Sequence, residues 1–209
     1  MKKSILSVLF AIVICFNGYS QVRIIPKPTK IVENKGYYSF SNTLRIYTDY
    51  NGETPNFNLS EIIHRNIVNK HRNFYLYIEN KVPQNKNGIF LRISKNLKEL
   101  GDEGYKLSVT TKKIEITAYT AKGIFYGIQS FLQLLPGDYV ISSEWSKGAV
   151  NIPCVEITDI PHFKWRGMLL DCCRHFMDKD FVKRYIDLLS YYKMNTFHWH
   201  LLNSERIIH

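Results

Sequence analysis

A strand–helix–strand pattern in the last quarter of the chain restricts the fold more than any other sequence feature. Trp165–Asp171 (WRGMLLD) is an apolar run without strict alternation, which is typical of a strand buried on both faces. Asp178 predicts the N-cap of a helix over Lys179–Tyr192, and Thr196–Leu202 (TFHWHLL) predicts a second strand. Strands joined by such a helix should be parallel. One βαβ unit cannot cover both faces of its sheet, so we expect that the elements that would complete it are missing from this chain.

The preceding part, from Val22 to about Ile160, instead predicts short strands separated by turns. Five runs rich in Ile, Phe, Leu and Tyr are strand candidates: Leu44–Thr48, Phe74–Ile78, Ile89–Ile93, Tyr105–Val109 and Ile114–Ala118. The last two flank a turn-like segment and predict a hairpin. Alternation in its second arm places Ile114, Ile116 and Ala118 on one face.

Two segments of the same part have the apolar spacing of helices. The first is Leu59–Val68, and the second is Ala121–Leu135, which Pro136-Gly137 should end. Strands with covering helices predict an α+β domain with an antiparallel-rich sheet over residues 21–160. The change of pattern near Ile160 predicts a domain boundary there.

Residues 1–20 have the features of a secretory signal peptide. Two lysines precede the apolar run Ile5–Cys15, and small residues lead to a predicted cut after Ser20. The run is shorter than the roughly 20 residues that span a bilayer, so no membrane span is predicted. The alternative is a lipoprotein anchored through Cys15, which bulky Ile14 disfavours. Both interpretations predict export, to the periplasm or outside the cell.

Charge and cysteine content exclude two further classes. The formal net charge is +10, but the basic residues are scattered without a run of four or more, and a nucleic-acid partner requires a clustered basic surface. Only Cys154, Cys172 and Cys173 follow the leader. Three cysteines cannot form a closed disulfide framework, and a vicinal bridge would be strained. We therefore expect small buried apolar residues at these positions.

Polar residues cluster where the two C-terminal strands should end. Asp171 ends the first strand, Arg174 lies in the loop after it, and His200 is close to the end of the second. Ligands of parallel α/β structures gather at the carboxyl ends of strands. An arginine there offers a planar fork of donors that suits adjacent hydroxyls or a carboxylate, and Asp171 can hold it in place. The alternative is a structural Asp–Arg pair.

The same region contains several residues that bind metals in other proteins. His198 and His200 are two apart on a strand and therefore share a face, with Cys172, Cys173 and His175 nearby. Structural zinc sites use cysteines spaced by two to four residues on loops, and this spacing is absent. We expect packed, hydrogen-bonded histidines, with neither a metal site nor a cofactor. The sequence also lacks a G-x-S-x-G nucleophile motif and a glycine-rich phosphate loop.

Three segments together resemble a known enzyme family. The stretch WRGMLLDCCRHFMDKDFVKRYIDLLSYYKMNTFHWHLL resembles the opening of the catalytic barrel of family 20 glycoside hydrolases, the β-N-acetylhexosaminidases. EGYKLSVTTKKIEITAYTAKGIFYGIQSFLQLLP resembles the small α+β domain that precedes that barrel, and IIPKPTKI fits the first strand of that domain. The resemblance extends up to Leu202. It implies that residues 161–209 begin a (β/α)₈ barrel, with about one βαβ unit present.

The resemblance also implies a substrate and a mechanism. The family removes terminal N-acetylglucosamine or N-acetylgalactosamine from glycans, and the arginine of its RHF motif, which matches Arg174, binds hydroxyls of the terminal sugar. Asp171 and His200 would support that arginine. Catalysis is retaining and substrate-assisted: the acetamido oxygen of the sugar attacks the anomeric carbon, an Asp orients the amide, and a neighbouring Glu is the general acid and base. That Asp–Glu pair belongs to a later strand and has no candidate in residues 1–209.

The agreement with the family breaks near the C-terminus. Where the family continues with T-D-D-Q-G-W-R, this chain has L-N-S-E-R-I-I-H, with Asn203 and Ser204 in place of the two aspartates. This break predicts a truncated or frame-shifted gene product, with a natural short paralogue as the alternative. We predict the N-terminal fragment of an exported β-N-acetylhexosaminidase that is inactive alone and self-associates through uncovered barrel strands. A non-catalytic exported module that binds a glycan or a partner is the rival.

Overall fold

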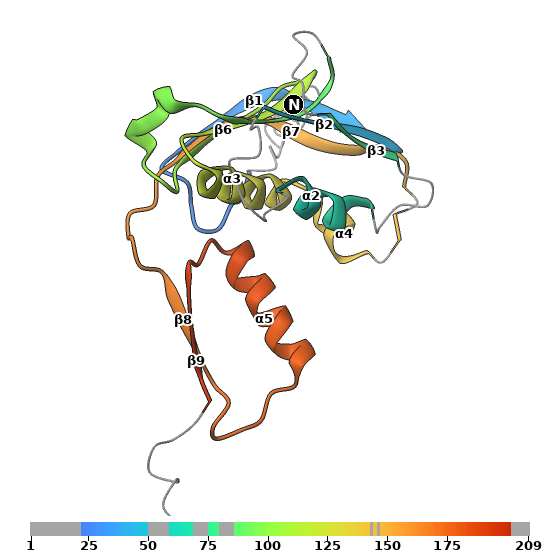
Figure 1. Cartoon of the computed structure of the whole chain (residues 1–209). Coiled ribbons are helices and arrows are strands. Elements are labelled where there is room, and N and C mark those ends of the chain that lie inside the picture. Colours follow the sequence, from blue (N-terminus) through green and yellow to red (C-terminus); the bar gives the residue numbers. More distant parts are fainter. Residues whose placement is uncertain are drawn as a thin grey trace, which may run out of the picture.

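The computed structural model describes residues 22–49, 59–68, 75–79, 86–142, 144–145 and 147–201. The predicted leader, residues 1–20, lies outside the described residues, as do Asn203 and Ser204. Figure 1 shows a broad layer of sheet and helices, from which a smaller strand–helix–strand unit projects.

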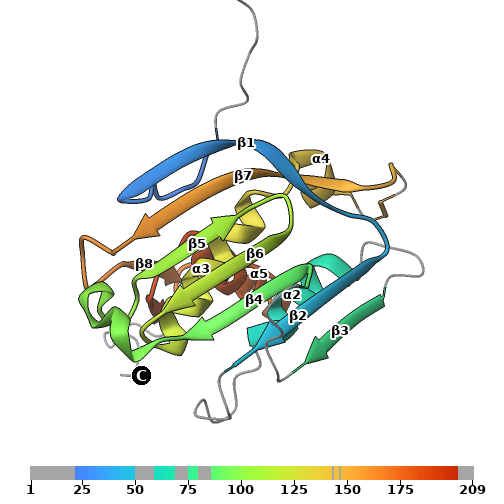
Figure 2. The ribbon, with the colours of Figure 1, turned by 90° about the horizontal axis from the view of Figure 1, so that it is seen from above.

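A seven-stranded mixed sheet forms the first layer, in the order β1-β7-β5-β6-β4-β2-β3 (Figure 2). Its strands are β1 (Lys30–Phe40), β2 (Thr43–Thr48), β3 (Tyr75–Glu79), β4 (Gly88–Ile93), β5 (Tyr105–Val109), β6 (Lys113–Ala118) and β7 (Val150–Asp159). All five strand predictions in this part are confirmed to within two residues at either end. The predicted hairpin joins β5 to β6 in antiparallel register.

Half of the pairings in this sheet are parallel. The strands β1, β7, β5 and β6 pair antiparallel, whereas β6, β4, β2 and β3 pair parallel. The sheet is therefore less rich in antiparallel pairs than the sequence predicted. The helix α2 (Leu59–Ile67) lies in the connection from β2 to β3, and a crossover of this kind makes the two strands parallel.

The helices α2, α3 (Ala121–Gln133) and α4 (Gly137–Ile141) lie on one side of the sheet (Figure 1), and the 3₁₀ helix η2 (Lys95–Leu100) precedes β5. The hydroxyl of Thr120 caps α3 by accepting hydrogen bonds from the backbone N–H groups of Lys122 and Gly123. The core between α3 and the hairpin is formed by Ile114, Ile116, Ala118, Ile124, Ile128 and Phe131, all fully buried. The predicted alternation in β6 is confirmed.

Two glycines allow α3 to lie against the hairpin. Gly123 and Gly127 are one helical turn apart, and a Cβ at Gly123 would overlap the carbonyl oxygen of Gly104 and lie 2.6 Å from the Cβ of Ala118. A Cβ at Gly127 would overlap the side chain of Ile116. The backbone of α3 is therefore closer to β5 and β6 than a helix with ordinary side chains at these positions allows.

We expect Gly123→Ala to lower the free energy of unfolding by about 1–3 kcal/mol, because a backbone carbonyl cannot move aside cheaply. Without a clash, alanine in a helix is favoured over glycine by about 1 kcal/mol and would raise the free energy of unfolding. A decrease in the free energy of unfolding would therefore show the clash. The measurement is the denaturant midpoint. The control is Gly137→Ala, where an added Cβ meets nothing within 4 Å and no loss is expected. Equal stability of the two variants would contradict the close packing of α3.

The βαβ unit is present as predicted. It comprises β8 (Gly167–Asp171), α5 (Lys179–Tyr191) and β9 (Thr196–His200), with the two strands parallel. The carboxylate of Asp178 accepts a hydrogen bond from the backbone N–H of Phe181 at 2.7 Å, which confirms the N-cap. Among the described residues, no helix has the length and apolar character needed to cross a bilayer.

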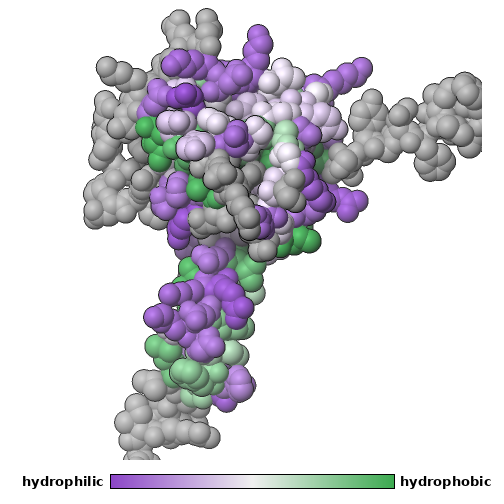
Figure 3. Space-filling view, turned by 90° about the vertical axis from the view of Figure 1, so that its right-hand side faces the viewer, coloured by the Kyte–Doolittle hydropathy of each residue, from purple (hydrophilic) through white to green (hydrophobic). Residues whose placement is uncertain are grey.

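The burial predicted for the first strand of this unit is wrong for the described residues. Met168 is 47% exposed and Leu169 is 54% exposed, so neither face of this strand is fully covered: Leu169 lies on the face away from α5, and α5 covers Met168 only in part. Figure 3 shows hydrophobic residues at the surface of this lower part of the molecule. Its exposed large apolar side chains include Met168, Leu169, Phe176, Ile186, Leu188 and Trp199.

Candidate functional site

The carboxyl ends of β8 and β9 bring the predicted site residues together. Asp171 and His200 are direct partners in the parallel register, and Arg174 follows in the loop after β8. The rings of Phe197 and Tyr185 lie 5.6 Å apart, so Phe197 is on the face of the strand pair that α5 covers. By the two-residue period of a strand, Asp171 and His200 are on the opposite face. In a barrel surrounded by helices, that face is the interior.

Asp171 is the centre of this group. Its Oδ1 accepts hydrogen bonds from the backbone N–H of Cys173 at 2.9 Å and of Arg174 at 3.3 Å. The Nδ1 atom of His200 lies 3.4 Å from the same oxygen, and the Nε atom of Arg174 lies 3.5 Å from Oδ2. These contacts fix the start of the loop and direct the side chains of Arg174 and His200 at one carboxylate.

The electrostatics of Asp171 favour its charged form. Partial desolvation by itself would raise the pKa of this carboxyl group, but the backbone N–H groups of Arg174 and Cys173, together with His200, outweigh it. The net result is a pKa below the ordinary value for aspartate. Asp171 is therefore ionised at neutral pH and can hold a guanidinium group.

Arg174 points into solvent, with 91% of its side chain exposed. In the described part of the chain its guanidinium forms an ion pair with Asp171 through Nε, and the two terminal nitrogens do not take part in that ion pair. A planar fork that is held at its base and open at its tip suits two adjacent hydroxyl groups of a sugar.

The neighbouring histidines and cysteines differ in part from the expectation. His200 is half-buried and contacts Asp171, but His198 is exposed. Cys154 is buried as predicted, whereas Cys172 and Cys173 are half-buried, and the thiol of Cys172 accepts a hydrogen bond from the indole of Trp199. The described residues contain no cluster of three or more His, Cys, Asp or Glu side chains placed to hold a metal ion.

A hollow of about 560 Å³ lies elsewhere, between α3 and α5. Its walls include Phe125, Tyr126, Leu189, Met194 and Phe197, and it borders the amino-terminal end of β9. It is therefore at the opposite end of the strands from Arg174. In barrels of this type, that end serves stability and the carboxyl end serves catalysis.

The chain matches two family models over nearly all of its described length. Residues 21–160 match "Glycosyl hydrolase family 20, domain 2", and residues 163–206 match "Glycosyl hydrolase family 20, catalytic domain". A β-hexosaminidase of Porphyromonas gingivalis is 40% identical over 119 residues, which are 57% of this chain and 15% of that protein. β-Hexosaminidase subunit A1 of Dictyostelium discoideum is 28% identical over 98% of this chain and 37% of its own length.

Solved structures agree with the family models. The Streptomyces plicatus N-acetyl-β-hexosaminidase, solved with Thio-NAglucal, has a TM-score of 0.75 and 30% identity over 86% of this chain and 34% of its own. The β-N-acetylhexosaminidase of Bacteroides fragilis has a TM-score of 0.69 and 30% identity over 87% of this chain and 33% of its own. The chain thus spans between 15 and 37% of these four relatives. With one model matching 140 of its 209 residues, the chain belongs to glycosyl hydrolase family 20.

Proposed function

We propose that this chain contributes the α+β domain and the first βα unit of the barrel to an exported β-N-acetylhexosaminidase. The enzyme would hydrolyse terminal N-acetylglucosamine or N-acetylgalactosamine residues of glycans. The observation that carries the proposal is the open guanidinium fork of Arg174, which Asp171 holds at the carboxyl end of β8. Family membership and the hexosaminidase relatives support the substrate class.

In this proposal Arg174 binds two adjacent hydroxyls of the terminal sugar. Charged donors make hydrogen bonds about twice as strong as neutral ones, and the planar geometry of the fork selects hydroxyls at the right spacing. Asp171 orients the guanidinium group through Oδ2, and His200 contacts the other carboxylate oxygen, Oδ1. Both are positioning residues in this proposal: Asp171 contacts Arg174, His200 and the backbone N–H of Cys173, and His200 contacts Asp171.

Bond cleavage would follow the substrate-assisted retaining scheme that the family resemblance implies. The acetamido oxygen of the bound sugar attacks the anomeric carbon, the glycosidic bond breaks, and a carboxylic acid protonates the leaving oxygen. Water then opens the cyclic intermediate with the same carboxyl group as base. Residues 171–200 would supply sugar binding, and the acid and its neighbouring Asp would come from a later strand.

Arg174→Ala tests the sugar-binding role in a protein that carries this chain together with a complete family 20 barrel. We expect kcat/KM for an aryl N-acetyl-β-glucosaminide to fall by about 100-fold, because a charged hydrogen bond contributes about 1.5–3 kcal/mol and each 1.4 kcal/mol is tenfold. Arg174→Lys keeps the charge but loses the fork, so an intermediate loss is expected. The control is Arg184→Ala, an exposed arginine of α5 that should leave kcat/KM unchanged. Equal activity of the Arg174 and Arg184 variants would contradict the role.

A further inference from the structure

Lys193 occupies a position where glycine is the usual residue. It follows α5 with a φ of 60°, in the left-handed region. The backbone N–H of Lys193 donates to the carbonyl of Ser190 at 2.9 Å, and that of Met194 donates to the carbonyl of Leu189 at 2.8 Å. These two bonds define a Schellman motif, in which the left-handed residue is most often glycine because a Cβ is disfavoured there. A lysine at this position indicates that its side chain is needed.

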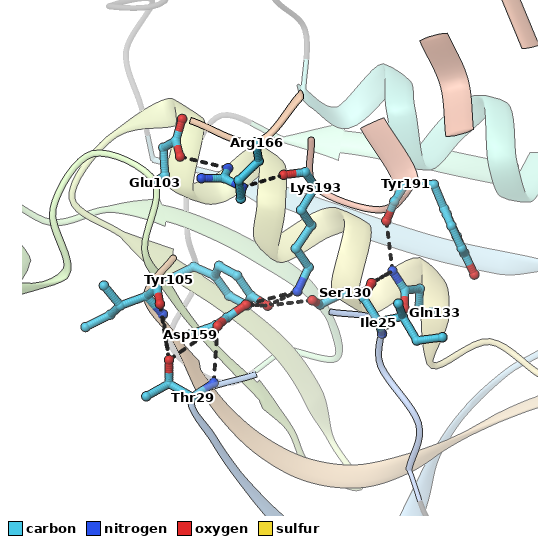
Figure 4. A network of polar contacts seen from close by, with 11 residues as sticks. Ile25, Thr29, Glu103, Tyr105, Ser130, Gln133, Asp159, Arg166, Tyr191 and Lys193 are labelled. Atoms are coloured by element: carbon cyan, nitrogen blue, oxygen red, sulfur yellow. Dashed lines mark hydrogen bonds and ion pairs between the residues drawn. The ribbon is translucent and has the colours of Figure 1, made fainter. Parts of the chain in front are cut away.

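The side chain of Lys193 is buried and crosses from the βαβ unit to the α+β domain (Figure 4). The residue is 5% exposed, and its Nζ lies 3.0 Å from Oδ2 of Asp159 and 2.9 Å from the hydroxyl of Tyr105. Asp159 ends β7 and Tyr105 begins β5. Burial lowers the pKa of Lys193 and Asp159 opposes the shift, so the ammonium group depends on this carboxylate for its stability.

The carboxylate that pairs with Lys193 has partners of its own in the α+β domain. Oδ2 of Asp159 accepts a hydrogen bond from the hydroxyl of Tyr105 at 3.0 Å, and Oδ1 accepts one from the backbone N–H of Thr29 at 3.2 Å. The hydroxyl of Tyr105 also shares a hydrogen bond with Ser130 of α3. The groups that bind the ammonium group, or that hold its partners in place, therefore come from β5, β7, α3 and the segment before β1. None of these elements belongs to the βαβ unit.

A second set of contacts extends the same junction to the beginnings of β8 and β9. Arg166, directly before β8, donates from Nε to the carbonyl of Lys193 at 2.9 Å and forms an ion pair with Glu103 at 2.8 Å. The side-chain amide of Asn195, directly before β9, donates to Glu103 at 3.2 Å and accepts from the backbone N–H of Arg166 at 3.0 Å. Glu103 lies in the turn before β5. Both strands of the βαβ unit are thus tied to the α+β domain at their amino-terminal ends.

We propose that Lys193 is the central residue of an interdomain latch, through which the α+β domain holds the βαβ unit in place and keeps it folded. The apolar contribution of α5 is small, since Val182 and Leu189 are its buried residues. A buried ion pair requires one arrangement of its partners, so the latch also sets the orientation of the unit. This role is separate from sugar binding, because the latch is at the opposite end of β8 and β9 from Arg174.

The test uses the whole chain and a protease that cuts the connection between the two units. Phe163 and Trp165 in this connection are exposed, and chymotrypsin cleaves after either residue once the segment opens locally. Lys193→Met leaves the Asp159 carboxylate buried without its cation, and we expect the cleavage rate to rise by at least about 100-fold, as breaking a buried pair implies. Lys193→Gly removes the strain of a left-handed backbone, but it also removes the ammonium group, so we expect faster cleavage for this variant too. Lys183→Met, an exposed lysine of α5, is the matched control with an expected change below twofold.

Two further measurements separate a latch from general destabilisation. Amide hydrogen exchange of Lys193→Met should lose protection in β8, α5 and β9 and keep it in β5, β6 and α3. The double variant Lys193→Met/Asp159→Asn should be cleaved little faster than the faster single variant, because both changes break one contact. Cleavage of Lys193→Gly at or below the wild-type rate would overturn the proposal. Loss of protection in β5 and β6 would overturn it as well, since the cluster would then belong to the core of the α+β domain.

Discussion

A polypeptide of these 209 residues is expected to release no aglycone from an aryl N-acetyl-β-glucosaminide above the rate of a protein-free blank. The proposed mechanism needs a carboxylic acid at the leaving oxygen and a second carboxylate at the acetamide, and the family resemblance implies that both belong to a later strand. General acid–base help alone contributes about 10²–10⁴-fold, and enzymes of all kinds exceed the uncatalysed rate by about 10⁶-fold or more. Arg174 can bind a sugar hydroxyl but cannot donate the proton at neutral pH.

The assay requires a control for contaminating hexosaminidase. Turnover that survives repurification and disappears in Arg174→Ala would show that residues 1–209 contain an acid that sequence reasoning missed. The DNA downstream of the coding segment provides the complementary observation. Barrel strands with a neighbouring Asp and Glu, encoded there in this frame or another, are the expected result. Downstream DNA without such strands would favour the rival interpretation, a non-catalytic exported module.

The whole chain is expected to self-associate, whereas residues 22–160 alone should be monomeric and unfold cooperatively. In the described part of the chain β8 pairs with β9 alone, so each strand has one open edge that can pair with another chain. The strand face with Leu169 is uncovered, and Trp199 is 45% exposed. The α+β domain, in contrast, buries its hairpin and α3 against each other.

Light scattering of the two polypeptides at equal concentration measures this difference. We expect a mass above the monomer value for the whole chain and the monomer mass for residues 22–160, with a single cooperative melt for the latter. Leu169→Gln places a polar group on the uncovered face and should reduce the association. A monodisperse monomer of the whole chain, with residues 161–209 resistant to protease, would contradict the prediction and support a natural short protein.

Local signals in the sequence determined most elements of the fold. The period of apolar residues located α3 and α5, Asp178 marked the start of α5, and alternation identified the buried face of β6. The strand–helix–strand order predicted that β8 and β9 are parallel, which places Asp171 beside His200. These features depend on neighbours within about one turn or one strand, so a single sequence contains the information for them.

The long-range arrangement was decided by tertiary structure. The sequence did not predict β7, because the alternation of buried and exposed residues in that strand is interrupted. It also placed the first strand too early, at IIPKPTKI, because β1 is an exposed edge strand with a bulge between Glu33 and Tyr37. Sheet order and the parallel half of the sheet depend on pairings between distant residues. The latch also depends on distant residues, because Lys193, Asp159 and Tyr105 are far apart in sequence. The sequence pattern is that of an exposed lysine, and the docking of α5 beside α3 buries its side chain. Periodicity and capping report local geometry, whereas burial of a charge depends on which distant segment supplies its partner.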